Sequence, residues 1–322
     1  MAKILVTGGA GFIGSNLTEA LLKEGHEVRV LDNFSTGKEE NLTFDENASA
    51  LEIIKGDITE SQVFPSAMRG VDYVFHQAAL PSVQQSVEDP LTSNRINVEG
   101  TLNVLMAAKE AGVKRVIYAS SCAIYGDDPG LPKQEGMAPH PLSPYALQKY
   151  IGERYVRLFS QLYRLETVSL RYFNVFGPKQ DPGSVYSAVI PRFIDALLRK
   201  RPPVVFGDGE QSRDFVYVGD VVRANLLAMS RGPLWGDFIN VASGRSLSLN
   251  QLLSFLNEIL SLPIPAVHQG PREGDVRHSL GDIQKAKQVL NYEPQVEIKA
   301  GLERTVHYWM REKGKERNEK KE

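Results

Sequence analysis

The sequence predicts an α/β protein with a doubly wound parallel sheet and a smaller α/β domain toward its C-terminal side. Two observations predict this fold class. Short apolar runs alternate with amphipathic helical patterns through the first half, which indicates parallel strands with helices on both faces of a sheet. A glycine-rich segment at residues 7–14 joins the first run to the first helix. The 322 residues suffice for a large core in one large or two intimately joined domains.

The expected elements follow in chain order. Strands are expected at 4–6, 28–31, 51–54, 73–75, 116–119 and 167–170. One helix is expected from Phe12 to about Glu24, where Gly25 ends it, and two more at 92–111 and 144–163. After about Arg171 the pattern changes. Loop-rich stretches at 178–187, 202–212 and 262–275 are typical of a substrate-binding region, and a helical stretch at 215–229 could return to the main sheet.

Composition excludes several classes of function. Hydrophobic residues make up 42% and charged residues 24%, as in ordinary soluble globular proteins. A net charge of −2 gives no support for nucleic-acid or polybasic membrane binding. The single cysteine, Cys122, rules out an intramolecular disulfide, and we expect no metal site. No apolar run approaches the roughly 20 residues that span a bilayer, and residues 3–7 read as a strand rather than a signal peptide, so we expect a cytoplasmic protein.

The glycine-rich segment TGGAGFIG at residues 7–14 has the chemistry of a dinucleotide loop. Gly8 permits a tight turn, Gly11 lets the backbone approach a diphosphate, and Gly14 allows close packing of helix and strand. The helix that follows presents free N–H groups and positive potential to the phosphates. Its position between a strand and a helix favours this interpretation over a merely flexible turn.

An acidic residue completes the nucleotide pattern. Asp32 ends the second strand, 18 residues after Gly14, where a carboxylate can accept hydrogen bonds from ribose hydroxyls and repels a 2′-phosphate. Asn33 follows and no arginine is adjacent, so NAD is favoured over NADP. Asp32 could instead cap a turn. Asp57, after the third strand, is a candidate adenine contact.

Tyr145 and Lys149 lie one turn apart at the start of the helix at 144–163, on the same face. The pKa of a tyrosine near 10 is too high for a base at neutral pH, and a nearby ammonium and the positive nicotinamide ring would both lower it. Ser121 follows the strand at 116–119, at the sheet edge where ligands collect, and could bond the reacting oxygen. Ser120 and Ser121 could alternatively satisfy a loop backbone, and Cys122 is expected to pack rather than react.

Together, the glycine loop, Ser121, Tyr145 and Lys149 resemble the extended short-chain dehydrogenase/reductase family, over about residues 3–310. Within it the chain looks most like the NAD-dependent UDP-hexose 4-epimerases, especially bacterial enzymes that interconvert UDP-N-acetylglucosamine (UDP-GlcNAc) and UDP-N-acetylgalactosamine (UDP-GalNAc). The matching segments are HQAAL at 76–80, PLSPY at 141–145, RYFNVFG at 171–177, SRDF at 212–215 and REGDVRHS at 272–279.

The resemblance implies a Rossmann domain that keeps NAD tightly bound. It implies an NAD-binding domain at 1–173 and 214–240 and a UDP-sugar-binding domain at 174–213 and 241–312, with 313–322 as a frayed, charged tail. The implied cofactor contacts are Gly8, Gly11, Phe12, Ile13, Gly14, Asp32, Asn33, Asp57, Ile58, Ala78, Ala79, Asn97, Tyr145 and Lys149.

The same resemblance implies the chemistry. Tyr145 would remove the proton of the sugar 4-hydroxyl while hydride leaves C4 for the nicotinamide. Lys149 would hold the nicotinamide ribose and tune Tyr145, and Ser121 would orient the 4-oxygen. The 4-keto sugar would then turn within the site and receive hydride on its opposite face.

For the substrate, the resemblance places Asn174, Arg213 and Arg272 on the diphosphate and Asp275 on the uridine ribose. Ala188, Val189 and Phe206 match the uracil pocket. Each arginine could alternatively form a structural salt bridge.

The residues that match the sugar pocket point to different sugars. Ser279 matches a position where a bulky tyrosine restricts related enzymes to non-acetylated hexoses, and Gln180 matches a position near the N-acetyl group. Ala123 and Pro81 depart from the serine and glycine of N-acetyl-specific relatives. We therefore expect UDP-GlcNAc and UDP-GalNAc as substrates, and UDP-glucose and UDP-galactose as further ones.

Related reactions would leave different signatures in the sequence. Cys122 and Ala123 stand where dehydratases carry an acidic pair and decarboxylases a glutamate. A UDP-glucuronate 4-epimerase, or another nucleotide-sugar-modifying member of the family, stays an alternative, although no partners for a substrate carboxylate stand out. The alternative from a different class is a catalytically silent sensor of NAD or sugar nucleotide.

The resemblance also implies a homodimer. Relatives dimerise through two helices per subunit, which here match 92–111 and 144–163. Leu102, Val104, Leu105 and Phe159 could supply the apolar surface between the two copies, or could belong to the internal core.

Overall fold

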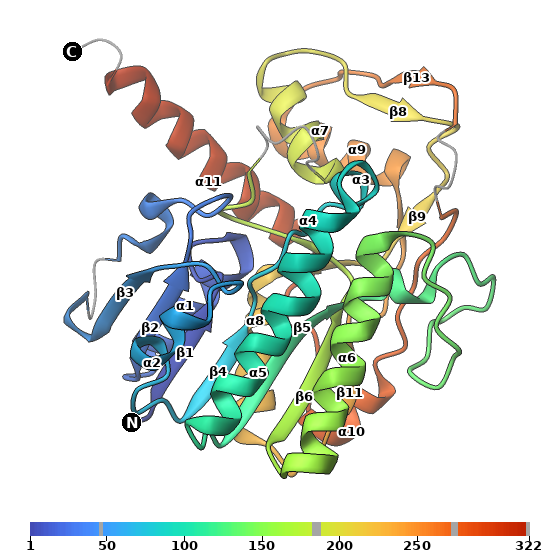
Figure 1. Ribbon diagram of the computed structural model, residues 1–322. Helices are drawn as coiled ribbons and strands as arrows, with labels where there is room; N and C mark the ends of the chain where they lie inside the picture. The colour runs from blue at the N-terminus through green and yellow to red at the C-terminus, as the bar shows by residue number, and fades with distance from the viewer. Residues whose placement is uncertain (45–47, 182–187, 272–275, 320–322) are drawn as a thin grey trace.

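The computed structural model of the chain describes residues 1–44, 48–181, 188–271 and 276–319 (Figure 1). Within these residues the main sheet is parallel throughout, with strand order β11-β6-β5-β4-β1-β2-β3. Its strands are β1 (Lys3–Thr7), β2 (Glu27–Asp32), β3 (Leu51–Lys55), β4 (Tyr73–His76), β5 (Arg115–Ser121), β6 (Glu166–Tyr172) and β11 (Asp237–Val241). The order reverses direction at β1, as in a doubly wound Rossmann sheet, so the predicted fold class is confirmed.

Helices cover both faces of this sheet. Figure 1 shows α5 (Gly100–Glu110) and α6 (Pro144–Tyr163) side by side on one face, and α6 contacts β5 and β6. On the other face α1 (Phe12–Lys23) packs against α8 (Val218–Ser230), which also contacts β5 and β6. The strands and helices expected from the first half of the sequence are all present. The stretch at 215–229 does return to the sheet, as the short strand β10 (Phe215–Tyr217) followed by α8.

Two details of the main sheet differ from the prediction. The expected helix at 92–111 is divided into α4 (Pro90–Asn94), a π-helical turn (Arg95–Glu99) and α5, and this wide turn carries the buried Asn97. The edge strand β11 was not predicted. Asn240, the fourth residue of β11, is fully buried and interrupts the apolar pattern. It can be buried because its side chain donates to the carbonyl of Lys133 and accepts from the Tyr125 hydroxyl.

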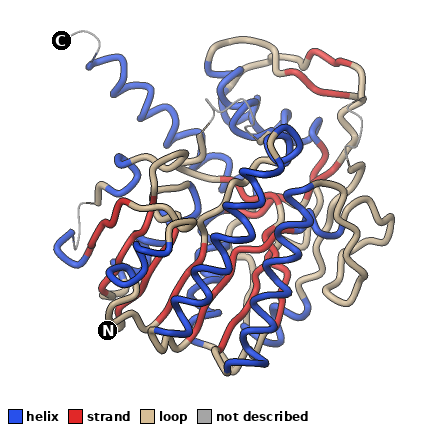
Figure 2. The backbone as a smooth tube through the Cα atoms, in the orientation of Figure 1, coloured by secondary structure: helices blue, strands red, loops and turns tan. Residues whose placement is uncertain are grey.

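The second region has its own core, centred on α7 (Val189–Leu198) and α9 (Leu249–Leu260). Figure 2 shows these helices together at one end of the molecule, above the carboxyl ends of the main strands. Short strand pairs complete it. They are β7 (Asn174–Phe176) with β10, β9 (Ser212–Arg213) with β12 (Leu247–Ser248), and β8 (Val204–Phe206) with β13 (Val267–Gln269). The stretches expected to be loop at 202–212 and 262–275 therefore contain strands.

The remaining elements are short, apart from the last helix. They are α2 (Phe64–Ala67), α3 (Val83–Glu88), α10 (Gln284–Leu290) and 3-10 turns at Glu39–Leu42, Ala48–Ala50, Ser61–Val63 and Cys122–Tyr125. The prediction of a frayed tail from residue 313 was wrong for 313–319, whose backbone continues α11 (Ile298–Glu319) away from the body of the molecule (Figure 1). Buried Leu302 and Val306 fix the first turns of α11, and the Lys, Arg and Glu residues beyond propagate a helix readily. Among the described helices, none is long and apolar enough to cross a membrane.

Helix and sheet approach each other very closely where α6 meets β5. A Cβ built on Gly152 of α6 would lie 2.2 Å from the hydroxyl oxygen of Tyr118, whose ring is fully buried in β5. Only glycine therefore allows α6 to lie this close to the strand. The contact sets the height of α6 above the sheet.

We predict that Gly152→Ala lowers the free energy of unfolding by about 1–3 kcal/mol, because the added methyl group must displace the helix or the tyrosine ring. Denaturant unfolding would measure it. Gly136→Ala is the matched control, because no described atom lies within 4 Å of a Cβ built there. Equal stabilities for the two variants would contradict the close approach.

Candidate active site

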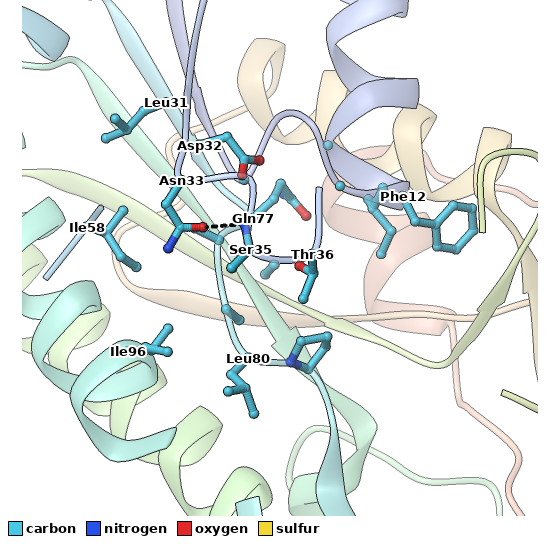
Figure 3. Close-up of a pocket in the computed structure, with 18 of the residues that line it drawn as sticks. Phe12, Leu31, Asp32, Asn33, Ser35, Thr36, Ile58, Gln77, Leu80 and Ile96 are labelled. Atoms are coloured by element: carbon cyan, nitrogen blue, oxygen red, sulfur yellow. Dashed lines mark hydrogen bonds between the residues drawn. The ribbon is translucent and has the colours of Figure 1, made fainter. Parts of the chain in front are cut away.

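A cavity of about 350 Å³ lies at the carboxyl ends of the central strands, where the strand order reverses. It collects the glycine loop, the end of β2, the loop after β4 and the start of α6. Figure 3 shows Asp32, Asn33 and Ser35 together in it, with Ile58 to one side and Phe12 to the other. The predicted cofactor residues that line it are Gly8, Gly11, Phe12, Ile13, Gly14, Asp32, Asn33, Asp57, Ile58, Ala78, Ala79, Tyr145 and Lys149.

The glycine loop has the geometry that its sequence suggested. Gly8 adopts φ +69°, and a Cβ there would lie 2.6 Å from the amide nitrogen of Ala78. A Cβ on Gly14 would lie 2.1 Å from the carbonyl oxygen of Gly8. The backbone of the glycine loop therefore packs directly against the loop after β4 and the first turn of α1. With no side chains from these glycines in the way, the start of α1 is open to the cavity.

Asp32 has a structural role in addition to its place on the cavity wall. Its carboxylate accepts hydrogen bonds from the backbone N–H of Ala10, at 2.9 Å, and of Phe34, at 2.8 Å. A carboxylate has about four lone-pair positions, so it retains capacity for a ligand hydroxyl. Next to it, the Asn33 side chain donates to Asp57 at 2.8 Å. Burial acts to raise the pKa of Asp57, but hydrogen bonds from Thr59 and Asn33 outweigh it and hold the pKa below its ordinary value.

Asn97 does not line this cavity. It is buried behind the loop after β4. Its amide accepts from the N–H of Leu80 at 2.8 Å and donates to the carbonyl of Leu80 at 3.1 Å. Asn97 therefore holds the loop that carries Ala78, Ala79 and Pro81, and all three of these residues line the cavity.

Several cavity residues had no sequence signal. Ser35, Thr36 and Asn41 come from the loop after β2, and Lys179 and Asp181 come from a segment far along the chain. The ammonium of Lys179 bonds Glu19 and the carbonyl of Asn41, both at 3.2 Å. Only the tertiary fold brings this cation to the cavity.

Tyr145 and Lys149 project from the first turns of α6 into the same cavity. The Lys149 ammonium donates to the carbonyl of Ala119 at 2.8 Å and lies 5.9 Å from the centre of the Tyr145 ring. The Tyr145 hydroxyl shares a hydrogen bond with the Ser121 side chain. The structure thus brings together the serine, tyrosine and lysine that the sequence singled out.

Burial dominates the electrostatics of this cluster. Burial raises the pKa of Tyr145 to about 12, although its hydrogen bond with Ser121 acts in the opposite direction. Burial also lowers the pKa of Lys149 to about 7. In the protein alone desolvation dominates both groups, and the lowering of the tyrosine pKa by the ammonium together with a bound nicotinamide ring stays a prediction. Burial likewise raises the pKa of the Cys122 thiol to about 12, which agrees with a packing role.

Further along α6, a buried ion pair fixes the helix to β5 and β6. Arg171 of β6 donates two parallel hydrogen bonds to Glu153, each 2.8 Å long, and the Ser120 hydroxyl donates to the same carboxylate at 2.6 Å. Arg171 also donates to the Tyr125 hydroxyl at 2.9 Å. This network ties α6 to the segment that carries Ser121.

A second cavity, of about 620 Å³, opens within the second region. Five predicted substrate residues line it: Asn174, Ala188, Val189, Phe206 and Arg213. Sequence reasoning missed Val83, Gln84, Arg192 and Gln211 on the same walls. The cavity offers guanidinium and amide groups beside apolar side chains, which suits an anionic ligand with a planar ring.

Asp214 organises this second cavity from behind. The carboxylate is fully buried and accepts from the N–H and hydroxyl of Ser243, from the N–H of Gly244 and from the N–H of Gly281. Its backbone carbonyl accepts from the Asn174 side chain at 3.0 Å. It thereby joins β9, β7 and the segment after Ser279.

Four predicted substrate residues lie outside the second cavity. Pro81 lines the first cavity, and Ala123 donates its N–H to Ser121. Gln180 donates to the carbonyl of Val175, and the Ser279 N–H donates to the carbonyl of Ser212 at 3.0 Å. Arg272 and Asp275 lie outside the described residues.

Comparisons with known proteins place this geometry among NAD-dependent enzymes. The pattern of the NAD dependent epimerase/dehydratase family matches residues 4–242. A UDP-glucose 4-epimerase of Mycolicibacterium smegmatis is 39% identical over 310 residues, which covers 95% of this chain and 98% of that protein. The structure of the UDP-N-acetylglucosamine 4-epimerase from Methanobrevibacter ruminantium M1 in complex with UDP-N-acetylmuramic acid superimposes with a TM-score of 0.92 at 41% identity, covering 97% of this chain and 99% of that one. The UDP-glucose 4-epimerase of Thermus thermophilus in complex with NAD gives a TM-score of 0.87 at 36% identity, covering 96% and 99%.

The depressed pKa of Lys149 predicts a pH-dependent stability. Its folded value of about 7 lies below the ordinary 10.5, so between these pH values the unfolded chain binds more protons than the folded chain. Stability should therefore rise with pH in this window, and the full cost of the buried ammonium is present below pH 7. From about pH 7 to about pH 9, the free energy of unfolding of the wild type should rise relative to Lys149→Met by about 1 kcal/mol per pH unit.

Urea unfolding of both proteins, each stripped of bound nucleotide beforehand and placed in the same buffers, measures this difference. Because both proteins keep every other titrating group, the shared contributions cancel. A difference between wild type and variant that stays constant across this pH range would show that Lys149 keeps an ordinary pKa.

Proposed function

The chain belongs to the NAD dependent epimerase/dehydratase family, and we propose that it interconverts UDP-GlcNAc and UDP-GalNAc, and also UDP-glucose and UDP-galactose, by inverting C4. The observation that carries this proposal is the pairing of two cavities. The first is lined by a dinucleotide loop and by Tyr145 and Lys149, with Ser121 hydrogen-bonded to Tyr145, and the second is lined by Asn174 and Arg213. The protein is an NAD-dependent 4-epimerase of UDP-sugars; the choice of sugar is the proposal.

The first cavity suits NAD. The packed glycines leave the start of α1 free for a diphosphate, and Asp32 at the end of β2 presents a carboxylate where ribose hydroxyls would lie. Apolar side chains of Leu31, Ile58 and Ile96 supply a surface for adenine. When bound, NAD accepts a hydride from C4 of the sugar and returns it to the opposite face.

In this mechanism side chains of α6 and β5 transfer and hold the proton of the sugar 4-hydroxyl. The Tyr145 oxygen takes the proton of the 4-hydroxyl and later gives it back, and Ser121 orients the 4-oxygen by a hydrogen bond. Lys149, held by the carbonyl of Ala119, stabilises tyrosinate through its positive charge. The intermediate is a 4-keto sugar, which must rotate to present its opposite face while its nucleotide stays in place.

The second cavity supplies the firm hold that this turning requires. Arg213 and Asn174 would bind the diphosphate, and the apolar wall formed by Val189 and Phe206 would hold uracil. By the family resemblance, Arg272 would add a second guanidinium and Asp275 a ribose contact. The sugar itself would lie between the two cavities and make fewer contacts.

Ser279 and its neighbours support an acetylated sugar. A serine leaves room that a tyrosine would fill, and its N–H is already held by Ser212 of β9. Pro81 and Ala123 give the pocket a different lining from the glycine and serine of N-acetyl-specific relatives, which supports acceptance of non-acetylated hexoses as well. A glucuronate 4-epimerase would need partners for the substrate carboxylate, and Arg192 is the one further cation on the described walls of the second cavity.

We predict that the purified protein converts UDP-GlcNAc to UDP-GalNAc without added NAD, and converts UDP-glucose to UDP-galactose as well. Chromatography of the nucleotide sugars measures both, with UDP-glucuronate assayed in parallel. Tyr145→Phe should bind UDP with unchanged affinity but lose at least about 100-fold in kcat, since it removes the proton acceptor. Absence of turnover with either sugar pair, with UDP still bound, would favour a sensor over an enzyme.

Ser279→Tyr tests the assigned sugar separately. The larger side chain should lower kcat/KM for UDP-GlcNAc at least about tenfold more than for UDP-glucose, because it competes only with the N-acetyl group. Equal losses for the two substrates would remove Ser279 from sugar selection.

We also propose a homodimer formed by α5 and α6. The residues that the sequence suggested for its surface are mostly internal, since Val104, Leu105 and Phe159 are buried in the core. The exposed apolar residues of the same helix pair are different ones, namely Met106, Leu147, Leu158, Leu162 and Tyr163. On α6 the three leucines recur at helical spacing along one outer face, which supports pairing with a second copy.

The prediction is that Leu158→Arg converts the protein from dimer to monomer, because Leu158 lies in the middle of that face and a charge cannot be buried there unpaired. Sedimentation equilibrium measures the mass. Leu131→Arg, at an equally exposed leucine away from both helices, is the control and should leave the dimer intact. A wild type that sediments as a monomer contradicts the proposal.

A further inference from the structure

The short helix α3 (Val83–Glu88) lies between the two cavities and packs against α6. Pro81, just before it, lines the first cavity, whereas Val83 and Gln84 in its first turn line the second. A ligand that spans the two cavities therefore passes this turn. None of these α3 residues was expected to have a role from the sequence.

A directional pair of hydrogen bonds connects α3 to the catalytic helix. The backbone N–H of Tyr145 donates to the Ser86 hydroxyl oxygen at 3.0 Å, and that hydroxyl donates to the carbonyl of Val83 at 2.6 Å. Because the Ser86 proton is committed to Val83, its lone pairs face Tyr145. Ser86 is fully buried, so water does not compete for these bonds.

The Tyr145 N–H is one of the amides at the start of α6 that have no partner within their own helix. The helix N-cap, Ser143, accepts from Ala146, and its backbone carbonyl accepts from Leu147. The amide of Tyr145 is thus satisfied from outside α6, by α3. Loss of that partner would leave a buried donor at the residue whose side chain must reach the sugar.

We propose that Ser86 is a positioning residue that connects Tyr145 to the wall of the second cavity, where the nucleotide of the substrate would bind. A nucleotide packed on Val83 and Gln84 steadies the first turn of α3, and the Ser86 bridge carries this order to the Tyr145 backbone. Binding in the second cavity thereby sets the tyrosine in place for the sugar attached to the same nucleotide. The inference rests on the proposed role of Tyr145.

Ser86→Ala tests the bridge in the full-length protein with its own bound cofactor. The variant should lose about 10- to 100-fold in kcat, as expected when a reacting group is displaced by a fraction of an ångström to an ångström. Its NAD content and its affinity for UDP, measured by calorimetry, should match the wild type. Ser86→Cys fills the same space with a weaker acceptor and should give an intermediate kcat.

Ser93→Ala is the matched control. Ser93 is also fully buried and also joins a neighbouring helix to α6, but it donates to the Gln148 side chain, at 2.6 Å, instead of accepting from Tyr145. If loosened helix packing were enough to impair turnover, this variant would lose activity too. We expect its kcat to stay within about twofold of wild type, a change of less than about 0.5 kcal/mol in the barrier.

Amide hydrogen exchange provides a readout that does not depend on turnover. In the wild type, UDP should slow exchange of the Tyr145 amide, and in Ser86→Ala that amide should exchange faster and no longer respond to UDP. An unchanged Tyr145 amide, or a Ser86→Ala enzyme with full kcat, overturns the inference. A wild type with UDP-dependent protection but no epimerase activity would instead overturn the proposed function and leave the bridge established.

Discussion

The docking of α6 on β5 is the constraint on which the rest of the site depends. At Gly152 the helix lies so close to Tyr118 that no side chain fits between them. On the two sides of this contact, Lys149 bonds the carbonyl of Ala119 and Glu153 accepts from Ser120. Consecutive residues at the end of one strand are therefore held by consecutive turns of one helix. Ser121, next in the strand, is placed opposite Tyr145 as a result.

The ion pair between Glu153 and Arg171 extends this constraint across the sheet. Both side chains are buried, and both guanidinium–carboxylate bonds are well formed. Such a pair adds little net stability over an apolar packing, but separating it is costly, so it penalises any other register of α6 on the sheet. Through Tyr125 and Asn240 the same network reaches the edge strand β11. A helix held this way suits the proposed mechanism, because its own groups would stay fixed while the substrate turns in the site.

Sequence patterns predicted the fold well wherever apolar residues follow a regular pattern along an element. The strands at the centre of the sheet are continuous apolar runs, and α1 and α6 are amphipathic with clear starts, so their positions followed directly. Elements that depend on a single buried polar residue were missed. Asn240 breaks the apolar pattern of β11, and Asn97 does the same in the π-helical turn within 92–111. Each polar side chain finds its hydrogen-bond partner only in the folded protein, so nothing in the sequence indicated that it would be buried. Lys179 and Gln84 were missed as cavity residues for the same reason, because only the fold brings their segments, far apart in sequence, to the cavity walls.

The sequence pattern names the groups that act on Tyr145, but the effect of burial on their pKa values appears only in the folded protein. Burial leaves Tyr145 with a pKa of about 12 and Lys149 with one of about 7. Bringing the pKa of the tyrosine down to neutral pH requires about 7 kcal/mol of stabilisation for its anion. A protonated Lys149 at 5.9 Å from the ring supplies about 3 kcal/mol at an effective dielectric constant of about 20.

A second positive charge in the same cavity would act on Tyr145 in the same direction as the lysine. Oxidised nicotinamide carries such a charge and its reduced form does not. Tyr145 should therefore lose its proton most readily in the state of the enzyme that is ready to receive hydride. In the proposed mechanism, reduction of the nicotinamide would remove that charge and leave Tyr145 with the proton taken from the sugar. The same change in charge thus favours proton removal before hydride transfer and retention of the proton until the hydride returns.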